Sequence, residues 1–361
     1  MTENRYVCTA CGSRHEPAVD RWRCDCGQPL VFAGESTPEG EPPTLDRDRG
    51  LWAFEDLLAV DRRVTLGEGW TPLIEGPERA VEYKLEWLFP TGSFKDRGAT
   101  TTISHALELG VDRVVEDSSG NAGAAIATYA ARAGLDAEIF VPADAKPGKL
   151  RAIERTGATV RRIEGDRAAV TEACLDTVTQ GEAWYASHAW NPAFFEGTAT
   201  MAHEIAAQRD WTAPDAVVTP LGHGTLFLGA YRGFERLVGA GWIDDIPRLY
   251  GVQAAGVAPI VSQRHGEAAA AGANDLADGI QIAAPAQERA IHEAIEDSGG
   301  DALAIDTETT EAEYDRLHRQ GLYTEPTCAV APAAMDDLRE RGEVSADDDV
   351  VVALTGSGLK T

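Results

Sequence analysis

The chain has 361 residues, of which 43% are hydrophobic and 25% charged, and its formal net charge is −27. A chain of this length can bury a large core and divide into more than one domain. The negative charge counts against nucleic acid and anionic lipid as partners. The 32 basic residues comprise five lysines and 27 arginines. This acidic, lysine-poor composition favours adaptation to high salt over an ordinary acidic protein, because concentrated salt screens self-repulsion. No stretch is apolar enough to span a membrane, and the polar start Met1–Arg5 is not a signal peptide. We therefore expect a cytoplasmic protein.

Two close cysteine pairs lie near the start of the chain: Cys8-x-x-Cys11 and Cys24-x-Cys26. Four thiolates in this arrangement predict a structural zinc site in a ribbon over residues 1–33. The second pair has one intervening residue where two are usual. Two alternatives stay open: a disulfide framework, disfavoured in the cytoplasm, and a nucleic-acid-binding ribbon, disfavoured by the charge. The remaining cysteines, Cys174 and Cys328, are predicted to be ordinary buried thiols.

A linker rich in Pro, Glu, Gly and Asp follows at 34–50. The sequence then predicts a helix over Leu51–Leu58 and a strand over Ala80–Glu86. Later segments alternate between strand and helix patterns. The expected strands are 111–116, 137–141, 158–163, 183–187, 215–220 and 350–354. This alternation predicts an α/β fold with a mostly parallel sheet and helices on both faces.

Lys95 lies in the stretch Pro90-Thr91-Gly92-Ser93-Phe94-Lys95-Asp96-Arg97-Gly98. A lysine that is partly buried loses its proton readily, and the free amine can attack a carbonyl carbon. The alternative is a turn before a helix, with Lys95 in solvent.

Three polar glycine loops follow predicted strands, at 117–123, 222–225 and 355–358. Ligands of open α/β sheets bind beyond the carboxyl ends of the strands, so one cleft could collect all three loops. Backbone amides of 222–225 could wrap a phosphate, although a plain tight turn is the alternative. A reactive lysine, a phosphate cradle, a polar loop and a threonine at a strand end are what pyridoxal phosphate requires. This cofactor acts as an electron sink while the protein orients it.

The sequence resembles the fold-type II pyridoxal-phosphate enzymes, the tryptophan synthase β family, and within it the threonine synthases most closely. The resemblance runs from about residue 65 to the C-terminus. It is carried by four motifs in order: Pro90–Gly98, Ser118–Gly123, Glu325-Pro326 and Ala353–Lys360. The cysteine ribbon is also similar to that of many threonine synthases.

The resemblance implies two doubly wound α/β domains with the cofactor between them. The larger would comprise 51–95 and 206–361, the smaller 96–205, and the protein would be a homodimer. Lys95 would form an imine with the cofactor and then move protons on the substrate. Asn121 would bond the cofactor's 3′-oxygen, and Thr355 would meet its pyridine nitrogen. The remaining contacts implied are Gly222, His223, Gly224, Thr225 and Leu226 to the cofactor phosphate, and Ser118, Ser119, Asn121 and Ala122 to the substrate carboxylate.

The sequence also departs from the family pattern. Phe89 replaces an asparagine, and Phe194 stands where an arginine would clamp the phosphate of O-phosphohomoserine. Ala199 replaces a lysine. An apolar ring cannot replace a guanidinium toward a dianion. Three readings stay open. In the first, the protein is a threonine synthase in which another cation compensates. In the second, it acts on another amino acid by β-elimination or β-replacement. In the third, it is a non-catalytic protein of this fold. The candidate compensating residues are Arg151, Arg155, His188 and His223.

Overall fold

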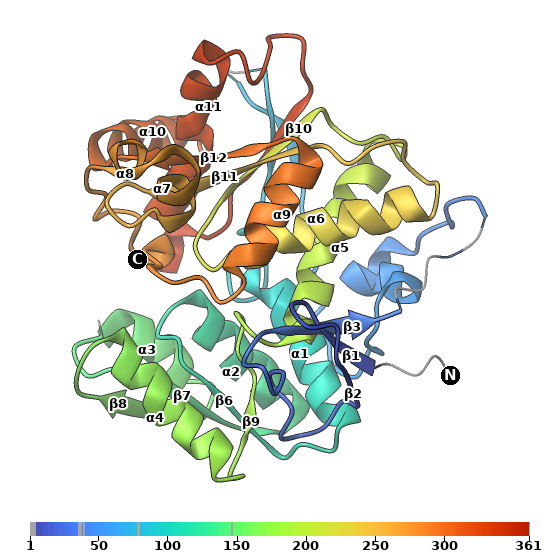
Figure 1. The fold of residues 1–361 in the computed structure, drawn as a ribbon, viewed down its shortest axis with the longest axis vertical. Helices are drawn as coiled ribbons and strands as arrows, with labels where there is room; N and C mark the ends of the chain where they lie inside the picture. Colours follow the sequence, from blue (N-terminus) through green and yellow to red (C-terminus); the bar gives the residue numbers. More distant parts are fainter. Residues whose placement is uncertain (1–4, 35–37, 39, 78–79, 146, 361) are drawn as a thin grey trace.

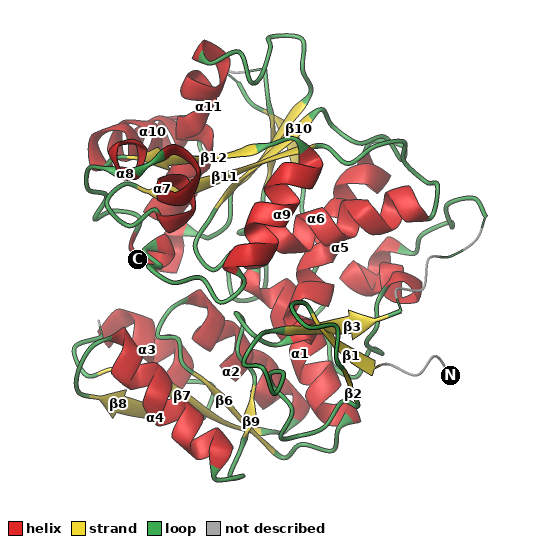
Figure 2. Ribbon diagram, in the orientation of Figure 1, coloured by secondary structure: helices red, strands yellow, loops and turns green. Residues whose placement is uncertain are grey.

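A computed structural model of the chain describes residues 5–34, 38, 40–77, 80–145 and 147–360. The chain forms two lobes, each built on its own sheet (Figure 1 and Figure 2). The lower lobe in Figure 1 has a parallel four-stranded sheet in the order β8-β7-β6-β9. Its strands are β6 (Arg113–Glu116), β7 (Asp136–Pro142), β8 (Thr159–Ile163) and β9 (Trp184–Tyr185). The helices that connect them are α2 (Asn121–Ala133), α3 (Pro147–Glu154) and α4 (Arg167–Thr179).

The upper lobe has a six-stranded sheet in the order β12-β11-β10-β13-β5-β4, in which β4 runs antiparallel to its neighbour and the other strands pair in parallel. Its strands are β4 (Leu73–Glu75), β5 (Glu82–Lys84), β10 (Ala216–Pro220), β11 (Arg248–Ala254), β12 (Asp301–Ile305) and β13 (Val350–Ala353). Its helices are α6 (Thr225–Gly239), α7 (Pro259–His265), α8 (Glu267–Ala270), α9 (Glu288–Ser298), α10 (Thr307–Arg319) and α11 (Val330–Glu340). The predicted α/β class and parallel pairing are confirmed.

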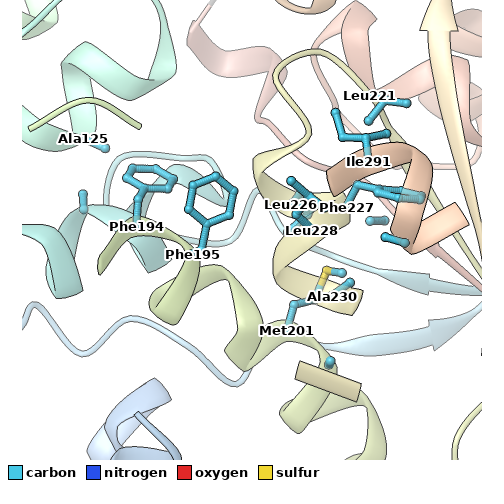
Figure 3. Close-up of a cluster of buried hydrophobic side chains, with 14 of the residues drawn as sticks. Ala125, Phe194, Phe195, Met201, Leu221, Leu226, Phe227, Leu228, Ala230 and Ile291 are labelled. Atoms are coloured by element: carbon cyan, nitrogen blue, oxygen red, sulfur yellow. The ribbon is translucent and has the colours of Figure 1, made fainter. Parts of the chain in front are cut away.

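Two helices, α1 (Lys95–Glu108) and α5 (Pro192–Gln208), lie where the lobes meet. Every residue from Pro192 to Ala206 is buried, which is expected only of a helix enclosed on all sides. Helix α5 packs closely on α6, and a Cβ at Gly233 would overlap the carbonyl of Ala199. Figure 3 shows Phe194 and Phe195 of α5 in the same buried cluster as Leu226 and Leu228 of α6. The central helices therefore form a tightly packed junction between the lobes.

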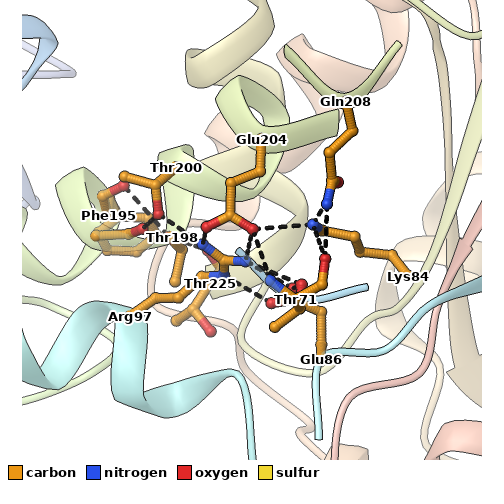
Figure 4. Close-up of polar contacts among 11 residues, drawn as sticks. Thr71, Lys84, Glu86, Arg97, Phe195, Thr198, Thr200, Glu204, Gln208 and Thr225 are labelled. Atoms are coloured by element: carbon orange, nitrogen blue, oxygen red, sulfur yellow. Dashed lines mark hydrogen bonds and ion pairs between the residues drawn. The ribbon is translucent and has the colours of Figure 1, made fainter. Parts of the chain in front are cut away.

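A polar cluster is buried where β5, α1 and α5 meet (Figure 4). The guanidinium of Arg97 donates to Glu86 at 2.7 Å and to both oxygens of Glu204 at 2.7 and 2.8 Å. Lys84 Nζ donates to the same Glu204 carboxylate at 2.9 Å. These side chains are fully buried, so each charge depends on the others for compensation.

The first described segment forms the small sheet β2-β1-β3, from β1 (Arg5–Cys8), β2 (Arg14–His15) and β3 (Leu30–Ala33). It packs beside α1, where Tyr6 Oη lies 2.6 Å from His105 Nε2. Trp22 makes edge-on contacts with Tyr185 and Trp190, at ring centroid distances of 5.3 and 5.1 Å. The segment is thus docked on the lower lobe.

The structure has a helix where one was expected over Leu51–Leu58, but it is a 3-10 helix over Arg47–Leu57 that is interrupted at Gly50 and Phe54. Gly50 has φ 63°, and its neighbour Leu51 donates its N–H to the Glu68 carbonyl at 2.7 Å. A Cβ at Gly50 would overlap that carbonyl, so the close approach requires glycine. The last four residues of the predicted linker, 47–50, belong to this 3-10 helix, and 35–37 and 39 lie outside the described residues. Within the described residues, no helix combines the length and apolar character that crossing a bilayer requires.

Candidate active site

The three polar glycine loops meet at one cavity of about 280 Å³. Ser118–Ala122 follows β6, Gly222–Thr225 follows β10, and Thr355 follows β13. These strands belong to two different sheets. The prediction that one cleft collects the carboxyl ends of these strands is confirmed. Lys95 and all the predicted cofactor- and substrate-binding residues line this cavity: Ser118, Ser119, Asn121, Ala122, Gly222, His223, Gly224, Thr225, Leu226 and Thr355.

Lys95 is the first residue of α1, and its Nζ donates to Thr225 Oγ1 at 3.0 Å. Burial lowers its pKa to about 7, although the charge of Glu325 acts in the opposite direction. The lowered pKa favours the unprotonated amine near neutral pH, which is the form that attacks a carbonyl carbon. Lys95 follows a turn and begins a helix, as the alternative also required, but its half-buried side chain lines the cavity.

The loop between β10 and α6 has the features of an anion cradle. Gly224 has φ 78°, and α6 begins at Thr225, so the first amides of the helix are free to point into the cavity. A Cβ at Gly222 would come within 3.1 Å of the Ile280 backbone, and one at Gly224 within 2.7 Å of Ile291. Glycine at these positions therefore lets the loop pack closely on Ile280 and Ile291.

Asn121 is the first residue of α2 and has partners on both sides of its amide. Its Nδ2 donates to the two Glu325 oxygens at 3.0 and 3.1 Å. Its Oδ1 accepts a hydrogen bond of 2.9 Å from Lys360 Nζ. Glu325 and Lys360 lie in two of the family motifs, but the sequence alone predicted no contact for either residue. The structure shows that both hydrogen-bond the Asn121 amide.

Thr355 lies at the end of β13, beside Cys328. The Cys328 sulfur accepts from the amides of Thr355 and Gly356 at 3.1 and 3.0 Å, and lies 3.4 Å from Thr355 Oγ1. Burial raises the pKa of this thiol to about 12, so it stays protonated and acts as a spacer, as predicted for an ordinary buried thiol.

Phe194 is fully buried at the base of the site. Its ring lies 5.7 Å from Lys95 Nζ and 6.0 Å from the ring of His188. A Cβ at Gly98 would overlap that ring, so α1 and α5 approach closely here. Ala199, further along α5, is buried. It lines neither this cavity nor the second cavity that adjoins it. Neither position offers a cation to a ligand.

Of the four candidate compensating residues, His188 and His223 line the cavity. Arg151 and Arg155 are exposed at the end of α3 and lie outside it. His188 Nδ1 lies 2.6 Å from Glu116 Oε1. Burial raises the pKa of Glu116 and lowers that of His188, so one proton is shared in an uncharged pair. A further cation, Arg167, lines the cavity and was missed because it begins a helix with no motif around it.

The family described as pyridoxal-phosphate dependent enzyme matches residues 64–356. Curated threonine synthases match along almost the whole chain. The one from Methanocaldococcus jannaschii is 32% identical, covering 98% of this chain and 92% of its own length. The one from Mycobacterium bovis is 35% identical, covering 85% and 87%. The chain belongs to the pyridoxal-phosphate dependent enzymes, in the family that includes threonine synthase.

The fold of this pyridoxal-phosphate dependent enzyme is similar to that of several solved structures. Maize serine racemase superposes with a TM-score of 0.68 at 20% identity, over 87% of this chain and 93% of its own. An aspartate racemase described as pyridoxal 5′-phosphate-dependent gives a TM-score of 0.65 at 24% identity, over 80% and 90%. At these identities the likeness supports the fold alone.

The cavity of this pyridoxal-phosphate dependent enzyme fits its cofactor. A phosphate could rest on the amides that follow Gly222. Lys95, with its lowered pKa, could reach an aldehyde from the same cavity. The two ring nitrogens of His223 are buried without a hydrogen-bond partner among the described residues, which indicates that a polar ligand completes this loop. The donor set therefore suits an anionic, aldehyde-bearing group.

Four cysteine sulfurs of this pyridoxal-phosphate dependent enzyme meet at the small sheet β2-β1-β3. The Sγ atoms of Cys8, Cys11, Cys24 and Cys26 all lie within 4.8 Å of one another. Cys8 and Cys26 are 3.5 Å apart, and Cys11 and Cys24 are 3.6 Å apart. All four thiols are free, so the disulfide alternative is not adopted. Tetrahedral zinc with bonds of about 2.3 Å would place its sulfurs roughly 3.8 Å apart, close to this arrangement.

Proposed function

We propose that the enzyme is a threonine synthase that converts O-phosphohomoserine and water to threonine and phosphate. Curated threonine synthases cover almost the full chain. The single observation that carries the chemistry is the position of Lys95, which lines the cavity collected from three strand ends and donates to Thr225 there. Burial in that position lowers its pKa to about 7. A lysine in that state can bond the cofactor aldehyde and exchange protons near neutral pH.

The protein's own residues divide the work. When bound, pyridoxal phosphate supplies an electron sink at the substrate's Cα. Lys95 Nζ takes and returns protons at Cα and at the adjoining carbons of the substrate. The loop Ser118–Ala122 holds the substrate carboxylate through hydroxyls and amides. Asn121 and Thr355 orient the cofactor ring, and the loop 222–226 holds its phosphate.

The test is product analysis with purified protein at high salt. We expect threonine and inorganic phosphate in equal amounts from O-phosphohomoserine. Ammonia and a 2-oxo acid from serine or threonine, with no turnover of O-phosphohomoserine, would favour the dehydratase alternative. A protein that shows no cofactor absorbance would fit the non-catalytic alternative. Lys95→Ala should lose both turnover and the adduct trapped by borohydride, whereas Arg155→Ala, at the end of α3 and outside the cavity, should keep both.

Several further features of the protein belong to the same proposal. The four cysteines hold one structural zinc ion, in a cytoplasmic setting that keeps thiols reduced. The enzyme works at high salt, as its charge of −27 supports, and forms a homodimer that sedimentation would detect. Residues 51–95 and 206–361 form the large domain and 96–205 the small one. The two separate sheets support this division, although the boundary at 205 falls inside α5.

A further inference from the structure

A second cavity, of about 670 Å³, adjoins the one that holds Lys95. The two cavities share a wall made of five residues: Arg167, His188, His223, Gln281 and Ile282. The second cavity extends from this wall along α4. A substrate whose Cα lies at Lys95 would therefore direct its far end toward this shared wall, which is the side of the first cavity nearest the second.

Arg167 is the cation of this wall. Apart from Lys95, it is the only lysine or arginine among the described residues that line the first cavity. Arg167, His188 and His223 line both cavities, so the guanidinium and the two imidazoles share one wall. Asp117, Glu172 and Asp176 are the acidic residues that line the second cavity. The carboxylate of Asp117 is engaged by Thr171 Oγ1 at 2.6 Å and Tyr185 Oη at 2.9 Å.

Two imidazoles complete the wall, with ring centroids 5.2 Å apart. His188 is held by Glu116 through Nδ1, which leaves Nε2 as the ring nitrogen available to the cavity. Both nitrogens of His223 are buried, and no residue in the described part of the chain bonds them. An unpartnered buried nitrogen is destabilising unless a ligand satisfies it. Each ring can therefore offer one N–H to an anion beside the Arg167 guanidinium.

We propose that Arg167, His188 and His223 form the subsite for the leaving phosphate of the substrate, in place of the arginine that the family pattern expects at Phe194. This rests on the proposed function. The Cγ–O bond breaks, and its electron pair stays with the departing phosphate. Cβ loses one proton and Cγ gains one, so that Cγ becomes the methyl group of threonine. Water supplies the hydroxyl at Cβ, and its remaining proton leaves with the phosphate as hydrogen phosphate. Arg167 offsets part of the phosphate charge, and the histidine N–H groups bond its oxygens.

The test compares Arg167→Gln with Arg151→Gln in the holoenzyme. Both residues are exposed arginines on helices of the lower lobe, but Arg151 lies outside both cavities. Three ligands are titrated: O-phosphohomoserine, inorganic phosphate as a competitor, and norvaline, which lacks a phosphate. We expect Arg167→Gln to raise the KM for O-phosphohomoserine and the inhibition constant for phosphate by roughly 10- to 100-fold, the effect of losing a charged hydrogen bond. Norvaline binding, followed by the cofactor spectrum, should stay within twofold, as should all three constants in Arg151→Gln.

The other outcomes distinguish a site for the substrate phosphate from a site for the cofactor phosphate. They also distinguish failure of the subsite from failure of the proposed threonine synthase activity. Weaker cofactor binding by Arg167→Gln, with unchanged inorganic phosphate inhibition, would assign the wall to the cofactor phosphate and overturn the subsite. Equal losses for norvaline and O-phosphohomoserine would also overturn it. If the wild type makes threonine and Arg167→Gln is unaffected, the subsite fails and the proposed function stands. If the wild type makes no threonine but phosphate binding requires Arg167, the anion subsite stands and the proposed function fails.

Discussion

Lys360 Nζ and Asn121 Oδ1 are joined by a hydrogen bond of 2.9 Å between residues 239 positions apart. The bond fastens the last described turn of the chain to the first residue of α2, inside the junction of the lobes. Burial lowers the pKa of Lys360, while Glu325 and Asp96 favour its charged form. Lys360 therefore contacts Asn121, a residue that lines the cavity, without lining the cavity itself.

This contact predicts that Lys360→Met weakens cofactor binding, because the Asn121 amide loses the partner that fixes its orientation. Losing a hydrogen bond to a charged group costs about 1.5 kcal/mol, or roughly tenfold in Kd. Equilibrium dialysis of the cofactor measures the effect. The neighbouring Leu359 is 84% exposed, so Leu359→Ala serves as the control. Equal affinities in the two variants would show that Lys360 does not orient the amide.

The lowered pKa of Lys95 predicts how cofactor association depends on pH. The folded pKa is about 7, against 10.5 for an ordinary lysine, because burial penalises the charged amine. The free amine therefore increases as pH rises through 7. We expect the rate of covalent cofactor attachment to the apoenzyme to rise roughly tenfold from pH 6 to 8 and then level off. Stopped-flow absorbance measures this rate. A rate that keeps climbing through pH 10 would mean that Lys95 has an ordinary pKa.

The contact between Gly98 and Phe194 predicts a coupled pair of mutations. Gly98→Ala places a methyl group against the buried ring and should cost about 1–3 kcal/mol of unfolding free energy. Combined with Phe194→Leu, the cost should be smaller than the sum by about 1 kcal/mol, because the smaller side chain makes room. Chemical denaturation provides the four free energies. A methyl group at the helical Gly148 would meet open space, so Gly148→Ala should be neutral or slightly stabilising. Additive costs for the Gly98 and Phe194 changes would refute the coupling.

The buried cluster around Arg97 predicts a large loss of stability on removing its cation. Arg97→Leu leaves the carboxylates of Glu86 and Glu204 without their shared partner and should cost about 3–5 kcal/mol. Arg63 pairs with Asp61 at the surface, where their side chains are 51% and 80% exposed. Arg63→Leu should change stability by less than about 0.5 kcal/mol. Urea unfolding at fixed salt compares the two, and similar costs would show that the cluster is not stabilising.

The cysteine cluster predicts one zinc ion per chain. Cys24→Ser should abolish zinc binding, because it removes one of the four sulfur ligands. It should also lower Tm, because the hydrophobic contacts of the ribbon form only when the metal holds the ribbon folded. Cys174 is buried in the lower lobe far along the chain, so Cys174→Ala should retain zinc. Elemental analysis of purified protein decides the point. A wild type free of zinc after expression in zinc-supplemented medium would contradict the assignment.

The sequence by itself determined the α/β class, the candidate lysine Lys95 and the three loops that meet around it. Each of these rests on a local pattern: alternating strands and helices, glycines at strand ends, and a lysine beside tight turns. Because parallel strands present their carboxyl ends at one edge, local order was enough to place these loops in one cleft.

The tertiary structure decided which cations reach that cleft. The sequence offered four equivalent candidates: Arg151, Arg155, His188 and His223. Of these four, the two histidines line the cavity. Arg167 also lines it, although no sequence motif marked this residue. The pairs Lys360–Asn121 and His188–Glu116 connect residues 239 and 72 positions apart. Local sequence patterns do not predict contacts between residues so far apart in the chain, because these contacts depend on how α1, α5 and the two sheets pack. The chain therefore specified its chemistry locally, whereas the packing of the two lobes determined the surroundings of the substrate.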